Sequence, residues 1–337
     1  MPHVDLSQDP AAVRRILLAL GLAREDEPVQ AIALTGGVSS GIYRIDLASG
    51  SYCLKQALPQ LKVAKLWQVP VERVFSEIAY LRTVHGIVPG HVPRVLGEDA
   101  ASGSFVMPFL GPEYRNWKSE LLAGRVAPEI ARTMGDLLGR IHAATADRPE
   151  IAARFATDAN FHALRLEPYL LETARVHPAL ADRLRAIADR TAGTRRVLVH
   201  GDVSPKNILL GPAGPVLLDA ECAWFGDPAF DLAFCLNHLL LKAAHAPAHA
   251  ASLVQAFTAL AEAYRLHVAW EPQTTLEGRV ATLLPALALA RIDGKSPVEY
   301  LGEPQRAAVR AASIALLQDP PSSLAHLADR WVRAFTA

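Results

Sequence analysis

The chain has 337 residues, half of them hydrophobic and a fifth charged, which suits one large or two medium globular domains. Lys and Arg together number 34, as do Asp and Glu, so the formal net charge is zero. Nucleic-acid binders usually carry a basic surplus, so the composition argues against them and favours a small-molecule partner.

The cysteine pattern and the hydropathy indicate where the protein works. Three cysteines without a CxxC spacing indicate reduced thiols, and the first ten residues lack the features of a signal peptide. The most apolar tract, 280–290, contains Thr282 and Pro285 and is too short to span a bilayer. We therefore expect a cytoplasmic protein that binds no membrane. The oligomeric state stays open, with a dimer as one option.

The N-terminal third predicts a small sheet with helices beside it. Residues 9–21 carry helix-capping residues at both ends and apolar residues between them. Residues 29–58 show β-branched and aromatic runs separated by short glycine turns, which predicts antiparallel strands. A second helix is expected over 69–86, followed by strands over 91–111.

Beyond a connector near 107–111, helical patterns dominate. Ala-, Leu- and Arg-rich periodicity fills most of the remaining chain, except for strands around 197–222. The predicted fold class is therefore α+β, with a small antiparallel β-rich lobe over 1–110 and a larger, mostly helical lobe over 111–337.

The segment 197–222, VLVHGDVSPKNILLGPAGPVLLDAEC, has the residues for phosphoryl transfer. Asp202 and Asn207 share one short loop, where a carboxylate could accept the proton of an attacking hydroxyl and an amide oxygen could bind a metal that bridges phosphates. Asp219 and Glu221 follow the next strand, and alternation along an extended chain would direct both to the same Mg²⁺. Each residue alone could be a loop cap, but the ordered set favours catalysis.

Two basic residues lie in the same loop. His200 is predicted to be structural, packing against the loop and bonding its backbone, rather than to act as a base. Lys206 could contact the γ-phosphate or point to water.

A glycine hairpin, LTGGVSSGIYRI, could bring backbone N–H groups close to phosphates. No Lys-Ser/Thr pair follows it, so it is not a P-loop. The alternative is an ordinary β-turn. The candidate residues are Gly36, Gly37 and Gly41, with Ser39 and Ser40 as additional hydroxyl donors.

Two further features of the predicted N-lobe suit a nucleotide. Lys55 lies in an apolar strand and needs an anion, for which phosphate and Glu77 are the candidates; a solvated edge-strand lysine is the alternative. In SFVMPFLG, the Pro108 carbonyl and the Leu110 N–H could bind adenine, with Met107 behind the base. An ordinary strand is the alternative there.

Together, the glycine hairpin, the Lys and Glu pair, HGDVSPKN, DAE and GDPAFDLA resemble the aminoglycoside phosphotransferase/choline kinase superfamily, which has a protein-kinase-like fold. The resemblance implies an enzyme that uses ATP and Mg²⁺ to phosphorylate a hydroxyl group of a small molecule. It implies Asp202 as catalytic base and Asn207 and Asp219 as magnesium ligands, with Glu221 as an additional ligand.

The same resemblance implies roles for four other residues. Lys55 would hold the α- and β-phosphates and pair with Glu77. Asp231 would brace the catalytic loop by accepting backbone N–H bonds, and Asp227 would also be structural.

A narrower resemblance, to 5-methylthioribose kinases, rests on ERVFSEIAYLR, HVPRVLGED and AWFGDPAFDLAFCLNHLLL. Those enzymes phosphorylate the anomeric hydroxyl of a ribose-like sugar. They carry paired arginines near the C-terminus, where this chain has Ala290 and Arg291, and a serine where it has Asn207. The expected acceptor is a methylthioribose-like pentose, with an aminoglycoside or an amino alcohol as alternatives.

Three basic residues of the predicted C-lobe have open roles. Arg291 and Lys295 could line the acceptor pocket, or pair with Asp293 or Glu299. Arg165 could belong to a solvated helix face. A non-catalytic nucleotide-binding scaffold is the second hypothesis for the whole chain.

Overall fold

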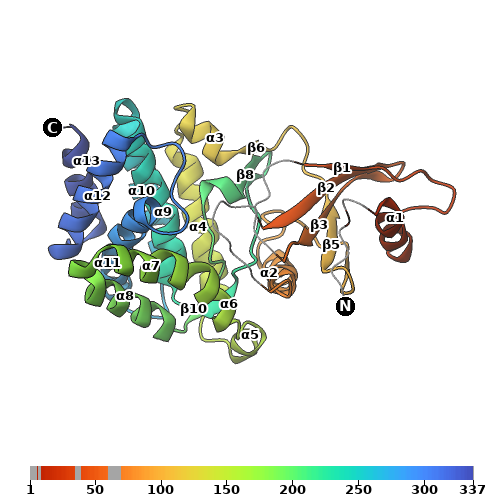
Figure 1. Cartoon of the computed structure of the whole chain (residues 1–337), viewed down its shortest axis with the longest axis horizontal. Coiled ribbons are helices and arrows are strands. Elements are labelled where there is room, and N and C mark those ends of the chain that lie inside the picture. Colours follow the sequence, from red (N-terminus) through yellow and green to blue (C-terminus); the bar gives the residue numbers. More distant parts are fainter. Residues whose placement is uncertain (1–5, 7–8, 35–38, 60–69, 337) are drawn as a thin grey trace. The chain divides into compact units, whose positions relative to one another are not determined.

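The computed structural model describes residue 6 and residues 9–34, 39–59 and 70–336 (Figure 1). The chain divides into two compact units, Met1–Tyr114 and Arg115–Ala337. The division lies close to the predicted boundary after residue 110. Among the described residues, none of the helices combines the length and apolar character that a membrane span requires.

The first unit contains a five-stranded antiparallel sheet, in agreement with the predicted N-terminal sheet. Its spatial order is β1 (Ala31–Ala33), β2 (Ser40–Leu47), β3 (Gly50–Ala57), β5 (Ser104–Pro108) and β4 (Gly97–Asp99).

Two helices accompany this sheet, α1 (Pro10–Ala19) and α2 (Arg73–Ile87). Asp9 caps α1 by accepting a hydrogen bond from the Ala12 N–H at 2.8 Å. The apolar side of α1 packs in one buried cluster with strand residues that include Leu54. Because successive side chains of a strand point to opposite faces, Lys55 points away from that cluster, and α2 contacts the same strand.

The second unit is mostly helical, as predicted for this part of the chain. Its helices are α3 (Trp117–Leu122), α4 (Pro128–Thr145), α5 (Pro149–Arg154), α6 (Asp158–Phe161), a π-helix (His162–Leu171), α7 (Glu172–Val176), α8 (Ala181–Gly193), α9 (Pro228–His245), α10 (Ala250–Arg265), α11 (Gln273–Asp293), α12 (Glu303–Gln318) and α13 (Leu324–Thr336). Its strands form a sheet of β6 (Arg115–Asn116), β8 (Ile208–Gly211) and β9 (Gly214–Leu217), and a pair of β7 (Val197–Val199) and β10 (Trp224–Gly226).

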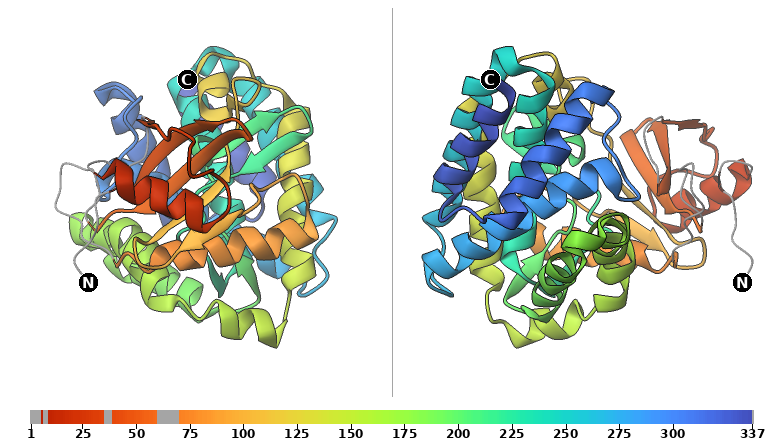
Figure 2. Two further views of the ribbon diagram at one scale, coloured as in Figure 1. Left: turned by 90° about the vertical axis from the view of Figure 1, so that its right-hand side faces the viewer. Right: turned by 60° about the vertical axis from the view of Figure 1, so that its left-hand side comes forward.

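Helix α9 is the central helix of this unit. All of its residues from 228 to 244 are buried, and it packs against α10, α11, α12, α13 and β7 (Figure 2). A helix that is apolar all round is typical of such a position. Its buried polar side chains, Asp231, Asn237, His238 and Lys242, therefore each require a physical explanation.

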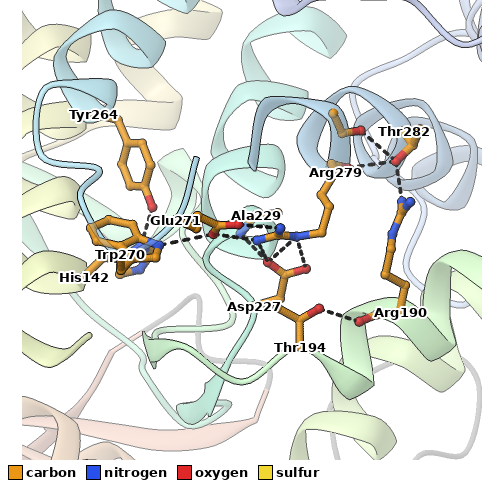
Figure 3. A network of polar contacts seen from close by, with 11 residues as sticks. His142, Arg190, Thr194, Asp227, Ala229, Tyr264, Trp270, Glu271, Arg279 and Thr282 are labelled. Carbon is orange, nitrogen blue, oxygen red and sulfur yellow. Dashed lines mark hydrogen bonds and ion pairs between the residues drawn. The ribbon is translucent and has the colours of Figure 1, made fainter. Parts of the chain in front are cut away.

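The N-terminus of α9 is fixed by ion pairs (Figure 3). Asp227 caps the helix by accepting from the Ala229 N–H at 2.9 Å. Its carboxylate also accepts from Arg279 of α11 at 3.0 and 3.1 Å, and Arg279 pairs in turn with Glu271. Burial raises the pKa of Asp227, although the Arg279 charge opposes this. These contacts support a structural role for Asp227.

Candidate active site

The loop that follows β7 packs tightly against the segment that follows β9. Gly201 has φ +79°, and a Cβ atom there would lie 2.8 Å from both the Cβ and the carbonyl oxygen of Cys222. Only glycine accepts this conformation and this approach without strain. The close packing places the loop that carries Asp202 beside the segment that carries Asp219 and Glu221.

Asp231 holds this loop from the first turns of α9. Its carboxylate is fully buried and accepts from the N–H groups of His200 at 2.7 Å and Gly201 at 2.8 Å. The ring of His142 lies 3.3 Å from the same carboxylate and contacts the Tyr264 hydroxyl at 2.7 Å, the latter contact drawn in Figure 3. The contacts to the loop backbone are those that the superfamily resemblance implies for Asp231.

His200 is a fully buried link between the loop and the end of β9. Its Nδ1 accepts from the Asp202 N–H at 3.1 Å, so its Nε2 is the nitrogen that donates to the Leu218 carbonyl at 3.1 Å. Burial lowers the pKa of His200, which favours this neutral form. Both ring nitrogens bond the backbone, which supports a structural role rather than that of a base.

Arg165 is the residue of this site that sequence reasoning underestimated. It extends from the π-helix, and its Nη2 lies 2.9 Å from Oδ2 of Asp202, while its Nε donates to the Gly201 carbonyl. The side chain is 7% exposed, so the prediction of a solvated helix face is wrong. Burial by itself lowers the pKa of Arg165, but the charges of Asp202 and of other nearby acidic groups together outweigh it, and the net shift is upward. Arg165 therefore stays cationic and orients the Asp202 carboxylate.

Asn207 lies in the short 3₁₀ turn Pro205–Asn207 and is buried. Its Nδ2 donates to the Asp202 carbonyl at 3.2 Å. The side-chain oxygen is therefore the group that could ligate a metal. Lys206, its neighbour, has an exposed side chain, and its carbonyl accepts from Asn116 at 2.7 Å.

The extended geometry expected for Asp219 and Glu221 is wrong. Strand β9 ends at Leu217, and the Ala223 N–H bonds the Ala220 carbonyl at 3.1 Å, so the chain turns here. Asp219 itself has φ +67°, a left-handed conformation that Asp tolerates better than most residues. Strand alternation therefore does not set the directions of these two carboxylates.

The acidic side chains of this region nevertheless all act on Cys222. Burial first, and then the negative charges of Glu221, Asp202 and Asp219, raise the pKa of the Cys222 thiol well above its usual range, while Arg165 opposes them. In the described ranges, no cluster of three or more His, Cys, Asp or Glu side chains is arranged to hold a metal ion.

An amide oxygen and one or two carboxylates are nevertheless a suitable donor set for Mg²⁺. This ion usually keeps several waters and takes its remaining ligands from one or two carboxylates and substrate phosphates. Asn207 and Asp219 supply hard oxygen donors on two segments that meet at the Gly201 contact, so the residues present fit a magnesium ion.

In the first unit, Lys55 and Glu77 form the predicted pair. The Lys55 Nζ lies 2.8 Å from Glu77 Oε1, with side-chain exposures of 5% and 3%. Strand β3 lies between β2 and β5, so the edge-strand alternative for Lys55 is wrong. A buried ammonium on a sheet, paired with a carboxylate on the following helix, is the arrangement that protein-kinase folds use for nucleotide phosphates.

The glycine hairpin is described only in part, because Gly36 and Gly37 lie outside the described residues. Ser39, Ser40 and Gly41 are buried where β2 begins. Arg73, which sequence reasoning missed, donates to the carbonyls of Ser39 at 2.6 Å and Leu58 at 2.7 Å. It thereby ties the chain just before β2, where the hairpin ends, to the chain just after β3.

The register of β3 against β5 determines where the Pro108 carbonyl points, and this carbonyl is part of the proposed adenine site. Pro108 faces Tyr52, and the Phe109 N–H donates to the Ser51 carbonyl at 3.0 Å. This makes Pro108 and Tyr52 a pair without mutual hydrogen bonds, so the Pro108 carbonyl points away from β3. On that side β4 pairs with β5 only as far as Val106. Among the described strands, none pairs with β5 on that side at the Pro108 carbonyl, which Met107 precedes and Leu110 follows.

Arg291 and Lys295 could line the acceptor pocket or form ion pairs with Asp293 or Glu299. The structure gives both residues other partners. Arg291 Nη1 donates to the Ser296 carbonyl at 2.5 Å and to its hydroxyl at 2.8 Å, and Lys295 Nζ pairs with Glu167 at 2.8 Å. Asp293 pairs instead with Arg310 and His177, and Glu299 with Lys118. The predicted ion pairs with Asp293 and Glu299 are therefore wrong.

Comparison with known proteins decides the family. Residues 30–267 match the model of the phosphotransferase enzyme family. The chain belongs to this family. Methylthioribose kinase 1 of Oryza sativa subsp. japonica is 25% identical over 234 residues, which are 59% of this chain and 53% of that protein. The chain thus spans about half the length of this curated relative.

Solved structures show the same fold at low identity. A choline/ethanolamine kinase family protein from Mesorhizobium loti has a TM-score of 0.55 at 17% identity, over 96% of this chain and 98% of that one. An amicoumacin kinase in complex with AMP-PNP and Ca²⁺ has a TM-score of 0.55 at 14% identity, over 92% and 95%. The predicted α+β, kinase-like fold class is therefore confirmed for this member of the phosphotransferase enzyme family.

Proposed function

We propose that this family member is an ATP- and Mg²⁺-dependent kinase that transfers the γ-phosphate of ATP to a hydroxyl group of a small molecule. The observation that carries the proposal is the Asp202 carboxylate, oriented by buried Arg165 on a loop whose backbone Asp231 holds. If the loop were only structural, it would not need a buried arginine paired with the Asp202 carboxylate, whose side chain is 16% exposed.

The chain's residues divide the work of in-line transfer. Asp202 accepts the proton of the acceptor hydroxyl as the new O–P bond forms, and the bond between the γ-phosphorus and the β–γ bridging oxygen breaks to release ADP. Lys55, held by Glu77, binds the α- and β-phosphates. Asn207 and Asp219 would hold Mg²⁺, whose chemistry when bound is to neutralise charge on the phosphate oxygens.

Glu221 is proposed as a further ligand, through water. The turn at 220–223 removes the strand argument for direct ligation, but its charge lies near those of Asp202 and Asp219. The backbone of the hairpin and the Pro108 edge are proposed to bind the phosphates and the adenine.

A pentose related to methylthioribose is the proposed acceptor scaffold, because curated relatives are named methylthioribose kinases. An amino alcohol is the alternative that the name of the choline/ethanolamine kinase family neighbour offers, and an aminoglycoside is the alternative that the superfamily resemblance implies. A non-catalytic scaffold is not favoured, since Asp202, Asn207, Asp219 and Lys55 are all present and held.

The test is an ADP-release assay over pentoses, thio-sugars, amino alcohols and aminoglycosides, combined with calorimetry of Mg-ATP binding. Asp202→Asn should lower kcat by about 1,000-fold and leave Mg-ATP affinity unchanged. Asp182→Asn, at a fully exposed carboxylate, is the matched control and should retain wild-type rates. Wild-type turnover by Asp202→Asn would reject the assignment of the base. Tight Mg-ATP binding without turnover of any acceptor would favour the scaffold.

A further inference from the structure

One face of α9 carries a line of side chains that begins at the catalytic loop. Asp231, Phe234, His238 and Lys242 are spaced by three, four and four residues, so they share a face. We call these four residues the α9 stripe. Asp231 contacts the loop backbone, and His238 lies seven residues further, roughly 10 Å along the helix axis at 1.5 Å per residue.

Ring contacts connect the stripe to the catalytic carboxylate. The Arg165 guanidinium, which pairs with Asp202, lies 5.8 Å from the ring centroids of both Phe234 and Tyr169. The Arg291 guanidinium lies 5.9 Å from the Tyr169 ring, and Phe234 packs against His238 at 5.4 Å. A continuous series of side-chain contacts therefore links Asp202 to Arg291 and to His238.

Lys242 ends the stripe with a buried ammonium group. Lys242 is 2% exposed, and its Nζ donates to the carbonyl of His238 on the same helix at 3.4 Å. The Tyr300 ring lies 5.1 Å from this Nζ and 5.9 Å from that of Lys118. Lysine is rarely buried so fully unless it is paired with an anion.

The cluster around Lys242 has more cations than anions. In the described part of the chain neither Lys242 nor Arg291 forms an ion pair with a carboxylate, and the nearby Glu299 pairs with Lys118. Burial, with the charges of Lys118 and Arg291, lowers the pKa of Lys242 to about 7. Burial and neighbouring cations also lower the pKa of His238 well below its usual range.

Two buried polar atoms of the cluster also lack a hydrogen-bond partner among the described residues. They are Nε of Arg291 and the hydroxyl of Tyr300. An oxygen-bearing anion would accept hydrogen bonds from these donors and neutralise the charge of the neighbouring cations. Lys118, Arg291 and Tyr300 are each partly exposed, so the cluster borders solvent although these two atoms are buried.

We propose that Lys242, Arg291, Tyr300 and Lys118 form a subsite for an anionic substituent, a carboxylate or a phosphate ester, on the acceptor. The proposal rests on the proposed kinase function and specifies its acceptor class. The acceptor carries its reactive hydroxyl toward Asp202 and its anion toward Lys242. Aminoglycosides and amino alcohols are cations and would be repelled, while a neutral sugar would leave Lys242 uncompensated.

The kinetic test compares acceptors that differ only in the anionic group. Neutral pentoses, pentose phosphates and hydroxy acids are assayed with the wild type and with Lys242→Met, which keeps the volume of the side chain without its charge. We expect an anionic acceptor to be preferred. Lys242→Met should raise the KM of that acceptor about 30-fold and leave the KM for ATP within twofold. The phosphate and hydroxy-acid arms distinguish the two anion types.

A binding test separates failure of this subsite from failure of the kinase assignment. Thermal unfolding is followed with inorganic phosphate or lactate added to the wild type, Lys242→Met and the exposed-site control Arg185→Met. An increase in Tm for the wild type and the control but not for Lys242→Met supports the subsite even if no acceptor turns over. Preferred turnover of a neutral or cationic acceptor, with KM unchanged in Lys242→Met, would overturn the subsite and leave the kinase intact.

Discussion

The guanidinium of Arg165 lies 2.9 Å from the carboxylate of Asp202, and the same arginine bonds the carbonyl of Gly201. It reaches them from a π-helix, a rare geometry that is frequent at functional sites. The carboxylate proposed as the base is thus oriented by a side chain more than thirty residues earlier in the chain.

Replacement of Arg165 should therefore affect the chemical step. Arg165→Met should lower kcat by about 100-fold, because a misplacement of about 1 Å is enough for that loss, and should leave Mg-ATP affinity unchanged. Steady-state kinetics and calorimetry measure the two quantities. Arg175→Met, on the exposed side of the neighbouring helix, is the control. An unchanged kcat in Arg165→Met would show that the pair is not needed to position Asp202.

Removal of one acceptor oxygen at Asp231 should destabilise the second unit. Asp231→Asn replaces one of two oxygens that accept backbone N–H bonds with an amide donor, and a buried unsatisfied N–H costs about 1–3 kcal/mol. Urea unfolding should show the loss, and kcat should fall as the loop relaxes. Equal stability of the variant and the wild type would contradict the bracing role.

The Lys55–Glu77 pair should govern nucleotide affinity. Lys55→Met removes a charge-assisted contact to phosphate and should weaken Mg-ATP binding by about tenfold or more, since 1.4 kcal/mol corresponds to a factor of ten. Glu77→Gln should act in the same direction by releasing Lys55. Glu98→Gln, at an exposed ion pair with Arg82, serves as the control in calorimetry. If Lys55→Met binds Mg-ATP like the wild type, the phosphate role is wrong.

Lys242 should make stability depend on pH. Its pKa is about 7 in the folded state, against an ordinary value of 10.5. Above pH 7 the folded state releases this proton while the unfolded state keeps it. The free energy of unfolding should therefore rise with pH, by at most about 1.4 kcal/mol per unit, whereas below pH 7 both states are protonated and the cost of the buried charge is complete.

The measurement is urea unfolding between pH 6.5 and 8.5, with the slope of Lys242→Met subtracted, because the buried cysteines titrate at about pH 8.5 in the unfolded chain and contribute equally to both proteins. The groups that face Lys242 are Lys118, Arg291, Glu299, Tyr300 and, on its own helix, Cys235 and His238. Lys242→Met removes the titrating amine and keeps those neighbours. Identical pH slopes for the variant and the wild type would show that Lys242 does not titrate in this range.

Local patterns were sufficient to predict the antiparallel N-terminal sheet, the mostly helical remainder and the HGD loop. These features depend on short-range periodicity and turn residues. The directions of Asp219 and Glu221 were not predictable, because a left-handed residue after β9 redirects the chain without a glycine to mark it. Cytoplasmic location stays a prediction of the sequence, and the oligomeric state stays open.

The roles of Arg165 and Lys242 required tertiary structure. Arg165 lies within an ordinary amphipathic pattern, and its partner Asp202 is identified only when the π-helix packs on the loop. Lys242 did leave a signal, because FDLAFCLNHLLLK carries four polar residues in an otherwise apolar helix, Asp231, Asn237, His238 and Lys242. Polar residues at 3–4 spacing inside a segment that must be fully buried deserve a search for a ligand.

Because Asp231 and Lys242 belong to one helix, α9 would fix the distance between the reacting hydroxyl and the anionic end of the proposed acceptor. Moving the cation by four residues, with His238→Lys and Lys242→Leu together, would shorten this distance by about 6 Å, at about 1.5 Å per residue. Substrate length would then be changed by helical register, while the loops that carry out the chemistry stay as they are.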